Sequence, residues 1–333
     1  MKHFSICVLV LILLAACMPP PAPTTSTPFP SATATQTSMS VSPTVTATSA
    51  SSPSPTATIT SNSHVPNFEH IVLIMFENKE FGKVIGNPSM PTFNKLAREY
   101  TLLTQHYAIR HPSLPNYIAL IGGDTFGIDS DCKDCFINAP SLPDLIEESG
   151  RTWRTYQEDM PDPCFLGDKG DYVQKHNPFV YFDPIRLDLE RCKRSVVPLT
   201  ELQTDIAANA LPNFLFIKPN LCNDGHDCKL DVVDAWLTNL LATLTPALDG
   251  TGEPYLIVMM FEEGQGDHTC CGLPDGGGRV AVVLDSPLVK NGFEDPTPYT
   301  HYSLLKTISA AWGLKYLGHA ADDSNVLITA PWK

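Results

Sequence analysis

The chain has 333 residues, of which 43% are hydrophobic and 17% charged, and its formal net charge is −14. Such a chain is long and apolar enough for one sizeable core, and its composition is globular overall. The negative charge disfavours a nucleic-acid partner, because a phosphate backbone is bound by basic surfaces. A phosphorylated substrate is not excluded, because a bound metal ion supplies positive charge locally.

The N-terminus has the pattern of a targeting segment. Lys2 precedes an apolar run over 4–14, which is followed by Ala-Ala and Cys17. The run is short for a transmembrane helix, and "LLAAC" resembles a bacterial lipobox, in which Cys17 is lipidated and becomes the mature N-terminus. We therefore predict a lipoprotein signal peptide over 1–17 and a lipid anchor on the extracytoplasmic side of the bacterial cell membrane. A plain secretory signal and a short membrane anchor are the alternatives.

The next segment, 18–66, changes composition sharply. It consists mainly of Pro, Ser, Thr and Ala, with almost no charge and few large apolar residues. Such a segment cannot bury enough surface to offset the entropy lost on ordering. We predict a disordered stalk that separates the membrane anchor from a folded domain over 67–333.

Eight of the ten cysteines lie in the predicted domain, and an even number in an exported domain favours disulfides. Their spacing makes three local pairs plausible: Cys132 with Cys135, Cys164 with Cys192, and Cys222 with Cys228. Cys270 and Cys271 are left to pair with each other or elsewhere. A zinc site at the Cys132 CxxC is the alternative, although a second CxxC or a nearby histidine pair is missing.

Apolar runs and helical patterns alternate along 67–333. The runs at 70–76, 213–219, 255–261 and 280–285 are nearly continuous, as in strands that are buried on both faces. Helical spacing of apolar residues occurs at 91–103, 141–149, 231–244 and 301–313, and in "LPNYIALIGG" from Leu114. The alternation predicts one α/β domain with a largely parallel sheet, covered by helices on both faces.

Ser113 stands between two prolines in "HPSLPNYIALIGG". Pro112 and Pro115 stiffen the backbone around it, because proline fixes φ. A serine at the start of a helix is an N-cap, a nucleophile or both, and the free N–H groups there favour a bound anion. Asn116, one helical turn later, is placed to donate to a phosphoryl oxygen.

Metal-ligand side chains follow three of the predicted strands. Glu77 and Asn78 follow the first, and Glu262 and Glu263 follow "YLIVMMF". The third group follows "NFLFIKP" and comprises Asn220, Asp224, His226 and Asp227. The carboxyl ends of parallel strands meet at one edge of a sheet, and these oxygen and nitrogen donors suit a divalent metal ion. Together they predict a metal site, with Ser113 as a nucleophile that the metal activates.

Five motifs in this order resemble the bacterial phosphoesterase family, which includes metal-dependent acid phosphatases and phospholipases C. They are "HIVLIMFENKEFGKVIGN", "HPSLPNYIAL", "NLCNDGHDC", "FEEGQGDH" and "YTHYSLLKTI". The resemblance covers essentially all of 67–320, and the serine segment has the form of the acid-phosphatase branch. It implies the three-layer α/β sandwich of the alkaline-phosphatase-like superfamily, with a mostly parallel central sheet.

The resemblance also implies roles for individual residues. Glu77, Asn78, Ser113, Glu262 and Glu263 correspond to metal ligands, and Ser113 to the nucleophile. His226, Asp227 and His301 correspond to phosphate contacts or to further metal ligands of the family. Glu262 departs from the family, which usually has aspartate there, so its longer side chain reaches the metal from a shifted backbone or binds differently.

The sequence offers further candidate site residues near the motifs. His111 either touches the site or is packed structurally, and His176 in "KHNPFVYF" resembles a block at the substrate mouth. Arg110 and Lys218 are candidates to offset phosphate charge. Asp267 and His268 occupy a loop that is shorter than in the phospholipase branch.

The function predicted is an extracytoplasmic, metal-dependent acid phosphatase that hydrolyses phosphate monoesters. The catalytic residues would be Ser113, Asn116, His226 and His301, and the metal ligands Glu77, Asn78, Ser113, Glu262, Glu263 and Asp227. Its cofactor would be a divalent ion of unknown identity, and its contact with the membrane would be the lipid anchor. The alternatives are a phospholipase C-type phosphodiesterase and a non-catalytic binding module on a stalk.

Overall fold

The computed structural model describes residues 65–270 and 275–333. The predicted signal peptide with Cys17, all but the end of the predicted stalk, and Cys271 lie outside these residues. Within the two described stretches, no helix combines the length and the apolar character that spanning a membrane requires.

A nine-stranded sheet forms the centre of the described domain, with the order β4-β3-β5-β1-β6-β7-β2-β8 and with β9 beside β2. The strands are β1 His70–Phe76, β2 Thr101–Tyr107, β3 Trp153–Gln157, β4 Val196–Pro198, β5 Phe214–Lys218, β6 Tyr255–Phe261, β7 Arg279–Asp285, β8 Phe293–Asp295 and β9 Tyr299–Thr300. Neighbouring strands pair in parallel except at β7, which is antiparallel to both β6 and β2. The predicted mostly parallel sheet is confirmed.

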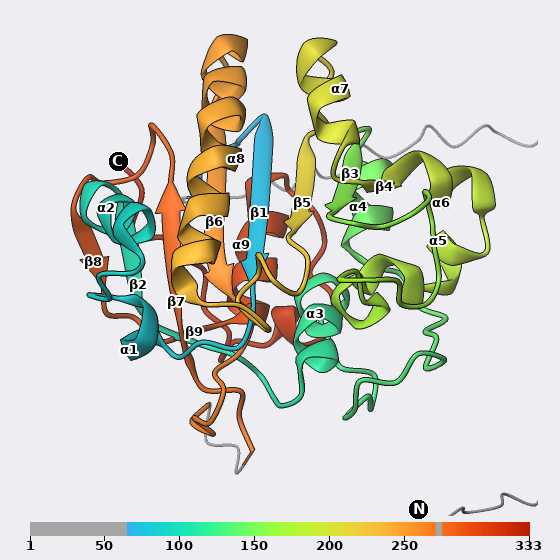
Figure 1. Cartoon of the computed structure of the whole chain (residues 1–333), viewed down its shortest axis with the longest axis horizontal. Coiled ribbons are helices and arrows are strands. Elements are labelled where there is room, and N and C mark those ends of the chain that lie inside the picture. Colours follow the sequence, from blue (N-terminus) through green and yellow to red (C-terminus); the bar gives the residue numbers. More distant parts are fainter. Residues whose placement is uncertain (1–64, 271–274) are drawn as a thin grey trace, which may run out of the picture. The chain divides into compact units, whose positions relative to one another are not determined.

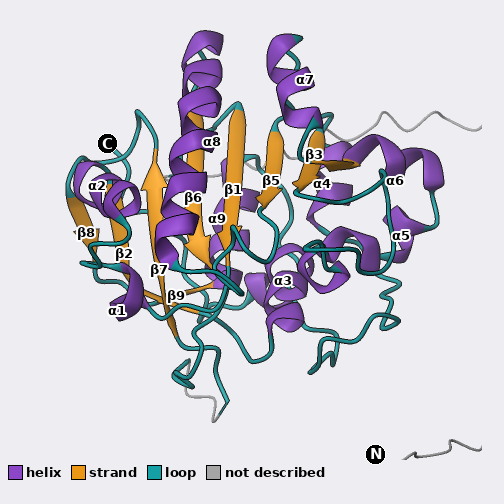
Figure 2. Ribbon diagram, viewed as in Figure 1, coloured by secondary structure: helices purple, strands orange, loops and turns teal. Residues whose placement is uncertain are grey.

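Helices cover both faces of this sheet, which gives the predicted three layers (Figures 1 and 2). They are α1 Phe81–Val84, α2 Pro91–Glu99, α3 Ser113–Gly122, α4 Leu142–Glu148, α5 Asp183–Arg186, α6 Leu189–Ser195, α7 Glu201–Ala207, α8 Leu230–Thr251 and α9 His301–Ala311, with short 3₁₀ turns η1 Gln174–His176, η2 Pro178–Tyr181 and η3 Gly318–Ala321. The long helix α8 lies in front of the sheet in Figure 1 and α9 lies behind it.

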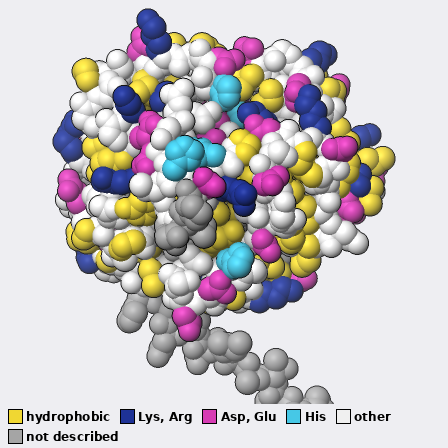
Figure 3. Space-filling model, turned by 90° about the horizontal axis from the view of Figure 1, so that it is seen from below, with side chains coloured by type: hydrophobic (Ala, Val, Ile, Leu, Met, Phe, Trp, Pro, Cys, Tyr) yellow, Lys and Arg dark blue, Asp and Glu magenta, His cyan; other side chains and the backbone are white. Residues whose placement is uncertain are grey.

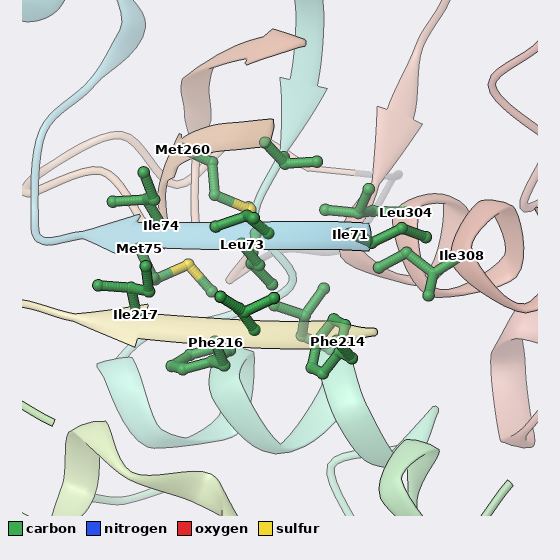
Figure 4. Packing of buried hydrophobic residues seen from close by; sticks show 14 of the residues in the cluster. Ile71, Leu73, Ile74, Met75, Phe214, Phe216, Ile217, Met260, Leu304 and Ile308 are labelled. Atoms are coloured by element: carbon green, nitrogen blue, oxygen red, sulfur yellow. The ribbon is translucent and has the colours of Figure 1, made fainter. Parts of the chain in front are cut away.

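The core is built on the central strands. Every residue of β1, β5 and β6 is buried, as the nearly unbroken apolar runs of the sequence indicate. Figure 4 shows Leu304 and Ile308 of α9 beside Ile71 at the start of β1. Burying one such aliphatic side chain contributes roughly 1.5–3 kcal/mol. The rigidity of this core fixes the strand ends, from which several site residues project.

Three disulfides confirm the predicted local pairs and hold loops around the sheet. They join Cys132 to Cys135, Cys164 to Cys192, and Cys222 to Cys228. The Cys132 pair is therefore a disulfide, and the alternative of a zinc site there is wrong. The predicted pairing of Cys271 lies outside the described residues.

Two predicted helices differ in extent from those observed. The pattern at 91–103 covers α2 and then the start of β2. The chain leaves the helix at Tyr100, and Thr101–Leu103 pair with β7 on one side and with β8 on the other. The pattern at 231–244 continues to Thr251, past Pro246. Because proline has no N–H, Pro246 cannot donate to the carbonyl of Ala242, four positions earlier. Both residues are exposed, so water can reach this carbonyl.

Gly123 ends α3 at a point where two backbone segments meet. Its φ is +78°, and a Cβ atom there would lie 2.2 Å from the carbonyl oxygen of Leu317. Its own carbonyl accepts a hydrogen bond of 2.7 Å from the N–H of His319. Gly127 has a similar φ of +74°, but a Cβ atom there would meet nothing within 4 Å. The two glycines thus differ in crowding and share the backbone conformation.

Replacing Gly123 with alanine is expected to destabilise the domain more than replacing Gly127. Both variants carry the left-handed cost of about 1–2 kcal/mol, and Gly123→Ala adds a backbone clash of roughly 1–3 kcal/mol. Denaturant unfolding measures both free energies of unfolding. Equal losses for the two variants would contradict the close approach.

Asp285 is a buried carboxyl at the end of β7, at the sheet edge opposite the ends of β1 and β6. Its Oδ1 has no hydrogen-bond partner among the described residues, and the side chain is 2% exposed. Burial, together with the charges of Asp249 and Glu99, raises the pKa of Asp285 to about 7, despite a hydrogen bond with Tyr100. The native protein therefore binds this proton more tightly than the unfolded chain does.

The contribution of Asp285 to stability is expected to fall as pH rises from about 4 to about 7 and to stay constant above that, because the folded pKa is the higher one. Asp285→Asn removes this dependence. The quantity to follow is the difference in free energy of unfolding between Asp285→Asn and wild type. From pH 4 to pH 8 this difference should shift by on the order of 3 kcal/mol in favour of the variant. A difference between the two proteins that does not change with pH would show that Asp285 is ionised throughout.

Candidate active site

The site lies at the edge of the sheet where β1, β5 and β6 end. Because the three strands are parallel neighbours, their carboxyl ends bring Glu77, Lys218 and Glu262 together although they are far apart in sequence. This edge faces down in Figure 1, and Figure 3 views the molecule from that side. Histidine, acidic and basic side chains gather near the middle of this face.

Ser113 is the first residue of α3, and Pro112 occupies the N-cap position. Its hydroxyl therefore makes no capping bond. Instead, Oγ lies 3.2 Å from Oε2 of Glu77 and 3.1 Å from Oε1 of Glu263. A hydroxyl has one proton, so it can satisfy one of these carboxylates at a time. The interpretation of Ser113 as a cap is wrong, and its side chain belongs to the carboxylate cluster.

The carboxylates of Glu77, Glu262 and Glu263 lie near Ser113 and have more acceptor oxygens than hydrogen-bond donors to satisfy them. Glu262 is fully buried, and its Oε2 accepts from the N–H groups of Asn78 (3.0 Å) and Glu263 (2.6 Å). Its Oε1 has no hydrogen-bond partner among the residues described. Burial, with the nearby charges of Glu77 and Glu263, raises the pKa of Glu262 well above its usual value. Burial also raises the pKa of Glu263, although His111 opposes this.

These features fit a divalent cation. An orphaned buried oxygen, a hydroxyl shared between two carboxylates and an excess of negative charge are features that a bound positive ion would satisfy. The donor set of Glu77, Asn78, Ser113, Glu262 and Glu263 supplies the oxygen ligands that hard divalent metals use. The structure thus brings five of the six predicted metal ligands together.

Asp227, the sixth predicted ligand, lies apart from this cluster. Its side chain is 57% exposed, and its Oδ1 lies 2.6 Å from Nδ1 of His226. The aspartate of this loop that reaches Glu77 is Asp224, which is fully buried. Both residues follow β5, so their order in the sequence did not distinguish them.

A second group of side chains surrounds the other oxygen of Glu77. Oε1 accepts a short hydrogen bond from the hydroxyl of Tyr117 and lies 3.3 Å from both Nε2 of His176 and Nζ of Lys218. Burial acts to raise the pKa of Glu77, but His176 and Lys218 outweigh it and hold this pKa below its usual value. No signal in the sequence pointed to Tyr117, because a tyrosine in an apolar helix is ordinarily a core residue.

Asn116 and His301 are buried and already well bonded. Asn116 Oδ1 accepts from the N–H groups of Ile109 (2.9 Å) and Arg110 (3.1 Å), and Nδ2 donates to the carbonyl of Arg110 (2.7 Å). Nδ2 also lies 3.5 Å from Oε2 of Glu263. His301 bridges the backbone carbonyl of Glu262 (2.7 Å) and the ring of His106 (3.1 Å). Both residues hold the backbone of the site.

His111 and the loop after β6 form one wall of the site. Nδ1 of His111 lies 2.6 Å from Oε2 of Glu263, and Nε2 lies 2.9 Å from the carbonyl oxygen of Asp267. The hydrogen bond to Glu263 is the main cause that raises the pKa of His111. Its ring also contacts that of His268, with centroids 4.8 Å apart. Glu80 fixes the same loop by accepting from the N–H groups of Gln265 and Gly266.

A cavity of about 700 Å³ adjoins the site through two shared segments. Tyr107 and Arg110 line it just before Ser113, and Tyr302 and Ser303 line it just after His301. The side chain of Arg110 is exposed. The cavity is therefore bounded by chain segments that continue into the site. Its lining offers tyrosine rings, hydroxyls and the Arg110 guanidinium, together with the carboxylates of Asp124 and Asp275 and the ring of His319.

Comparison with known proteins identifies the family. Residues 87–315 match the model of the phosphoesterase family. The chain belongs to this family. The matched range includes Ser113, Glu262 and Glu263, whereas Glu77 and Asn78 precede it.

Curated relatives include acid phosphatases of fungi and a bacterial enzyme. The phosphate-repressible acid phosphatase of Penicillium chrysogenum is 35% identical over 270 residues, and the match covers 78% of this chain and 63% of that protein. The acid phosphatase of Aspergillus fumigatus is 32% identical, with 80% of this chain and 60% of that protein covered. The match thus spans less than two thirds of these phosphatases. The phosphatidylinositol-3-phosphatase of Mycobacterium tuberculosis is 30% identical, with 78% of this chain and 82% of that protein covered.

Solved structures confirm the predicted fold. A member of the alkaline phosphatase superfamily from Vibrio parahaemolyticus has a TM-score of 0.52 at 10% identity and covers 78% of this chain and 71% of its own. Human ectonucleotide pyrophosphatase/phosphodiesterase 5 has a TM-score of 0.53 at 12% identity and covers 79% of this chain and all of its own. At 10% and 12% identity, the likeness to these two proteins is evidence for a shared fold alone.

A divalent cation is expected to raise the melting temperature of chelator-treated protein. At a free-ion concentration about 100 times the dissociation constant, the stabilisation is about 2.7 kcal/mol. Glu263→Gln should shrink this shift because it removes a charge beside Ser113, whereas Asp227→Asn should preserve it because Asp227 lies apart. Differential scanning calorimetry with Mg²⁺, Ca²⁺, Mn²⁺ and Zn²⁺ measures the shifts. A shift lost in Asp227→Asn would instead place Asp227 among the ligands.

Proposed function

We propose that this protein is a metal-dependent phosphatase of the acid-phosphatase type, which hydrolyses phosphate monoesters through Ser113. The observation that carries the proposal is the contact of the Ser113 hydroxyl with two carboxylates, Glu77 and Glu263, at the start of a helix. The kinship with acid phosphatases of fungi supports the same substrate class. A divalent ion bound among these carboxylates would lower the pKa of the hydroxyl and offset charge on the phosphoryl oxygens.

In the first step, Ser113 Oγ attacks phosphorus and the bond from phosphorus to the ester oxygen breaks. Glu263 takes the hydroxyl proton, since its Oε1 lies 3.1 Å from Oγ. The leaving oxygen receives a proton from His226, which is exposed and whose ring centroid lies 6.0 Å from that of His176. Nδ1 of His226 is held by Asp227, so Nε2 is the nitrogen that exchanges the proton. The N–H of Ser113, the first of α3, is the group placed to face the developing charge, because the next N–H, of Leu114, already donates to Oδ1 of Asp131 (3.1 Å) and Pro115 has none.

In the second step, water attacks the phosphoserine, gives its proton to His226 and releases phosphate. Ser113 then regains its proton from Glu263, which restores the starting state. Asn116 and His301 act in this scheme by holding the backbone next to Ser113 and Glu262 rather than by touching phosphate. The adjoining cavity beside Arg110 and Tyr302 would receive the alcohol part of the ester.

We further propose that the domain works outside the cytoplasm on a lipid-anchored stalk. Its three disulfides support an oxidising compartment. The lipobox pattern at Cys17 supports the anchor. Metabolic labelling with a fatty-acid analogue, compared between wild type and Cys17→Ala, tests the anchor directly.

Replacing Ser113 with alanine is expected to lower kcat on nitrophenyl phosphate by at least about a thousandfold, because the nucleophile is lost. Circular dichroism and the melting temperature should show that the variant folds. Wild-type activity should vanish with chelator and return with a divalent ion. Ser149→Ala, outside the site at the end of α4, is the matched control and should keep full activity.

A Ser113→Ala protein with full turnover would rule out this nucleophile. Hydrolysis of bis-nitrophenyl phosphate at rates above those for nitrophenyl phosphate would favour the phosphodiesterase alternative. Absence of hydrolysis and of metal binding in folded wild-type protein would favour a binding module.

A further inference from the structure

The carboxylate of Glu77 has two sides, and each faces a separate group of ligands. Oε2 faces Ser113 and the amide of Asn78, the side at which the catalytic ion is proposed. Oε1 faces Tyr117, His176 and Lys218. One buried carboxylate between two groups of this kind is an arrangement suited to bridging two cations.

The second side contains the side chains of a metal site. Atoms of Glu77, His176 and Asp224 that can bind a metal all lie within 4.8 Å of one another, and all three residues are buried. Nδ1 of His176 lies 3.4 Å from Oδ2 of Asp224. Nε2 of His176 makes no hydrogen bond to any residue of the described stretches, although the ring is 2% exposed. One imidazole and two carboxylates form a ligand set typical of zinc.

A lysine stands within this second group. Lys218, the last residue of β5, is 1% exposed. Its Nζ lies 2.6 Å from Oδ2 of Asp224, 3.3 Å from Oε1 of Glu77 and 3.5 Å from the carbonyl oxygen of Met75. An ammonium group has three donors, and here three acceptors surround it. Its positive charge is placed where a metal ion bound by Glu77 and Asp224 would stand.

We propose that the ammonium of Lys218 takes the place of a second metal ion, and that its loss would open a zinc site formed by Glu77, His176 and Asp224. Two cations this close would repel each other strongly in a buried environment, so the lysine excludes metal from this side. Lys218 is in this view a positioning residue that acts through Glu77. Its side chain offsets buried carboxylates, in contrast to the predicted contact with substrate phosphate.

The inference that wild type binds one ion in total rests on the proposed function. The exclusion of a second ion by Lys218 does not rest on it. The experiment therefore counts zinc ions on chelator-stripped proteins, by native mass spectrometry and elemental analysis, without measuring activity. Lys218→Met is expected to bind one more zinc ion than wild type. Lys218→Gln keeps polar donors for folding but loses the charge, and it should gain the same ion. Adding His176→Ala to Lys218→Met should remove that ion again.

Lys79→Met is the matched control. Lys79 also lies beside the site, but its Nζ donates to the carbonyl oxygens of Gly225 (2.7 Å) and Asn78 (3.1 Å) rather than to carboxylates. Its replacement should leave the zinc count unchanged. A folded Lys218→Met or Lys218→Gln protein with the wild-type count would overturn the proposal, and so would two ions on wild-type protein. A wild-type protein without any ion would instead refute the metal dependence of the proposed function.

Discussion

Glu77 places a carboxylate with no solvent exposure at the end of a strand that is itself fully buried. An isolated charge there would cost several kcal/mol, so its surroundings must compensate it. The structure does so with Lys218, His176 and Tyr117 on one oxygen and with Ser113 and Asn78 on the other. The compensating groups come from three elements around Glu77: Lys218 from β5, His176 from η1, and both Ser113 and Tyr117 from α3.

The compensation is unequal on the two sides. On the Lys218 side an ammonium meets two carboxylates. On the Ser113 side Glu262 and Glu263 add negative charge, and among the described residues the one ion pair with these two is that of His111 with Glu263. Burial is the main cause that raises the pKa values of Glu262 and Glu263, and the neighbouring charge of Glu77 raises both further. A site with surplus carboxylate beside the Ser113 hydroxyl is suited to a cation and a phosphoryl group, and the kinship with acid phosphatases agrees with this.

Much of the architecture could be predicted from local sequence, and the reasons are physical. β1 and β6 are continuous apolar runs, so their limits were evident, and the residues after them point to a common edge. β2 was hidden behind a helical pattern, and β8 and β9 are too short to carry a pattern at all. Two partners of Glu77, Tyr117 and His176, could not be predicted, because they reach it only through the packing of α3 and η1. Asp224 and Asp227 both follow β5, so the sequence does not show which of them reaches Glu77. In the structure Asp224 is buried beside Glu77, whereas Asp227 is exposed.

β7 runs antiparallel to both of its neighbours, and this direction decides where the chain passes between β6 and β7. A parallel strand would need a crossover to return the chain to the far edge. β6 and β7 are antiparallel neighbours instead, so the connection between them begins at the site, where its described first part, 262–270, lies. That loop begins with Glu262 and is held by Glu80 and His111. Insertions or deletions within it would leave the sheet order intact while changing the rim of the site. New substrate ranges can therefore arise here at little cost to folding.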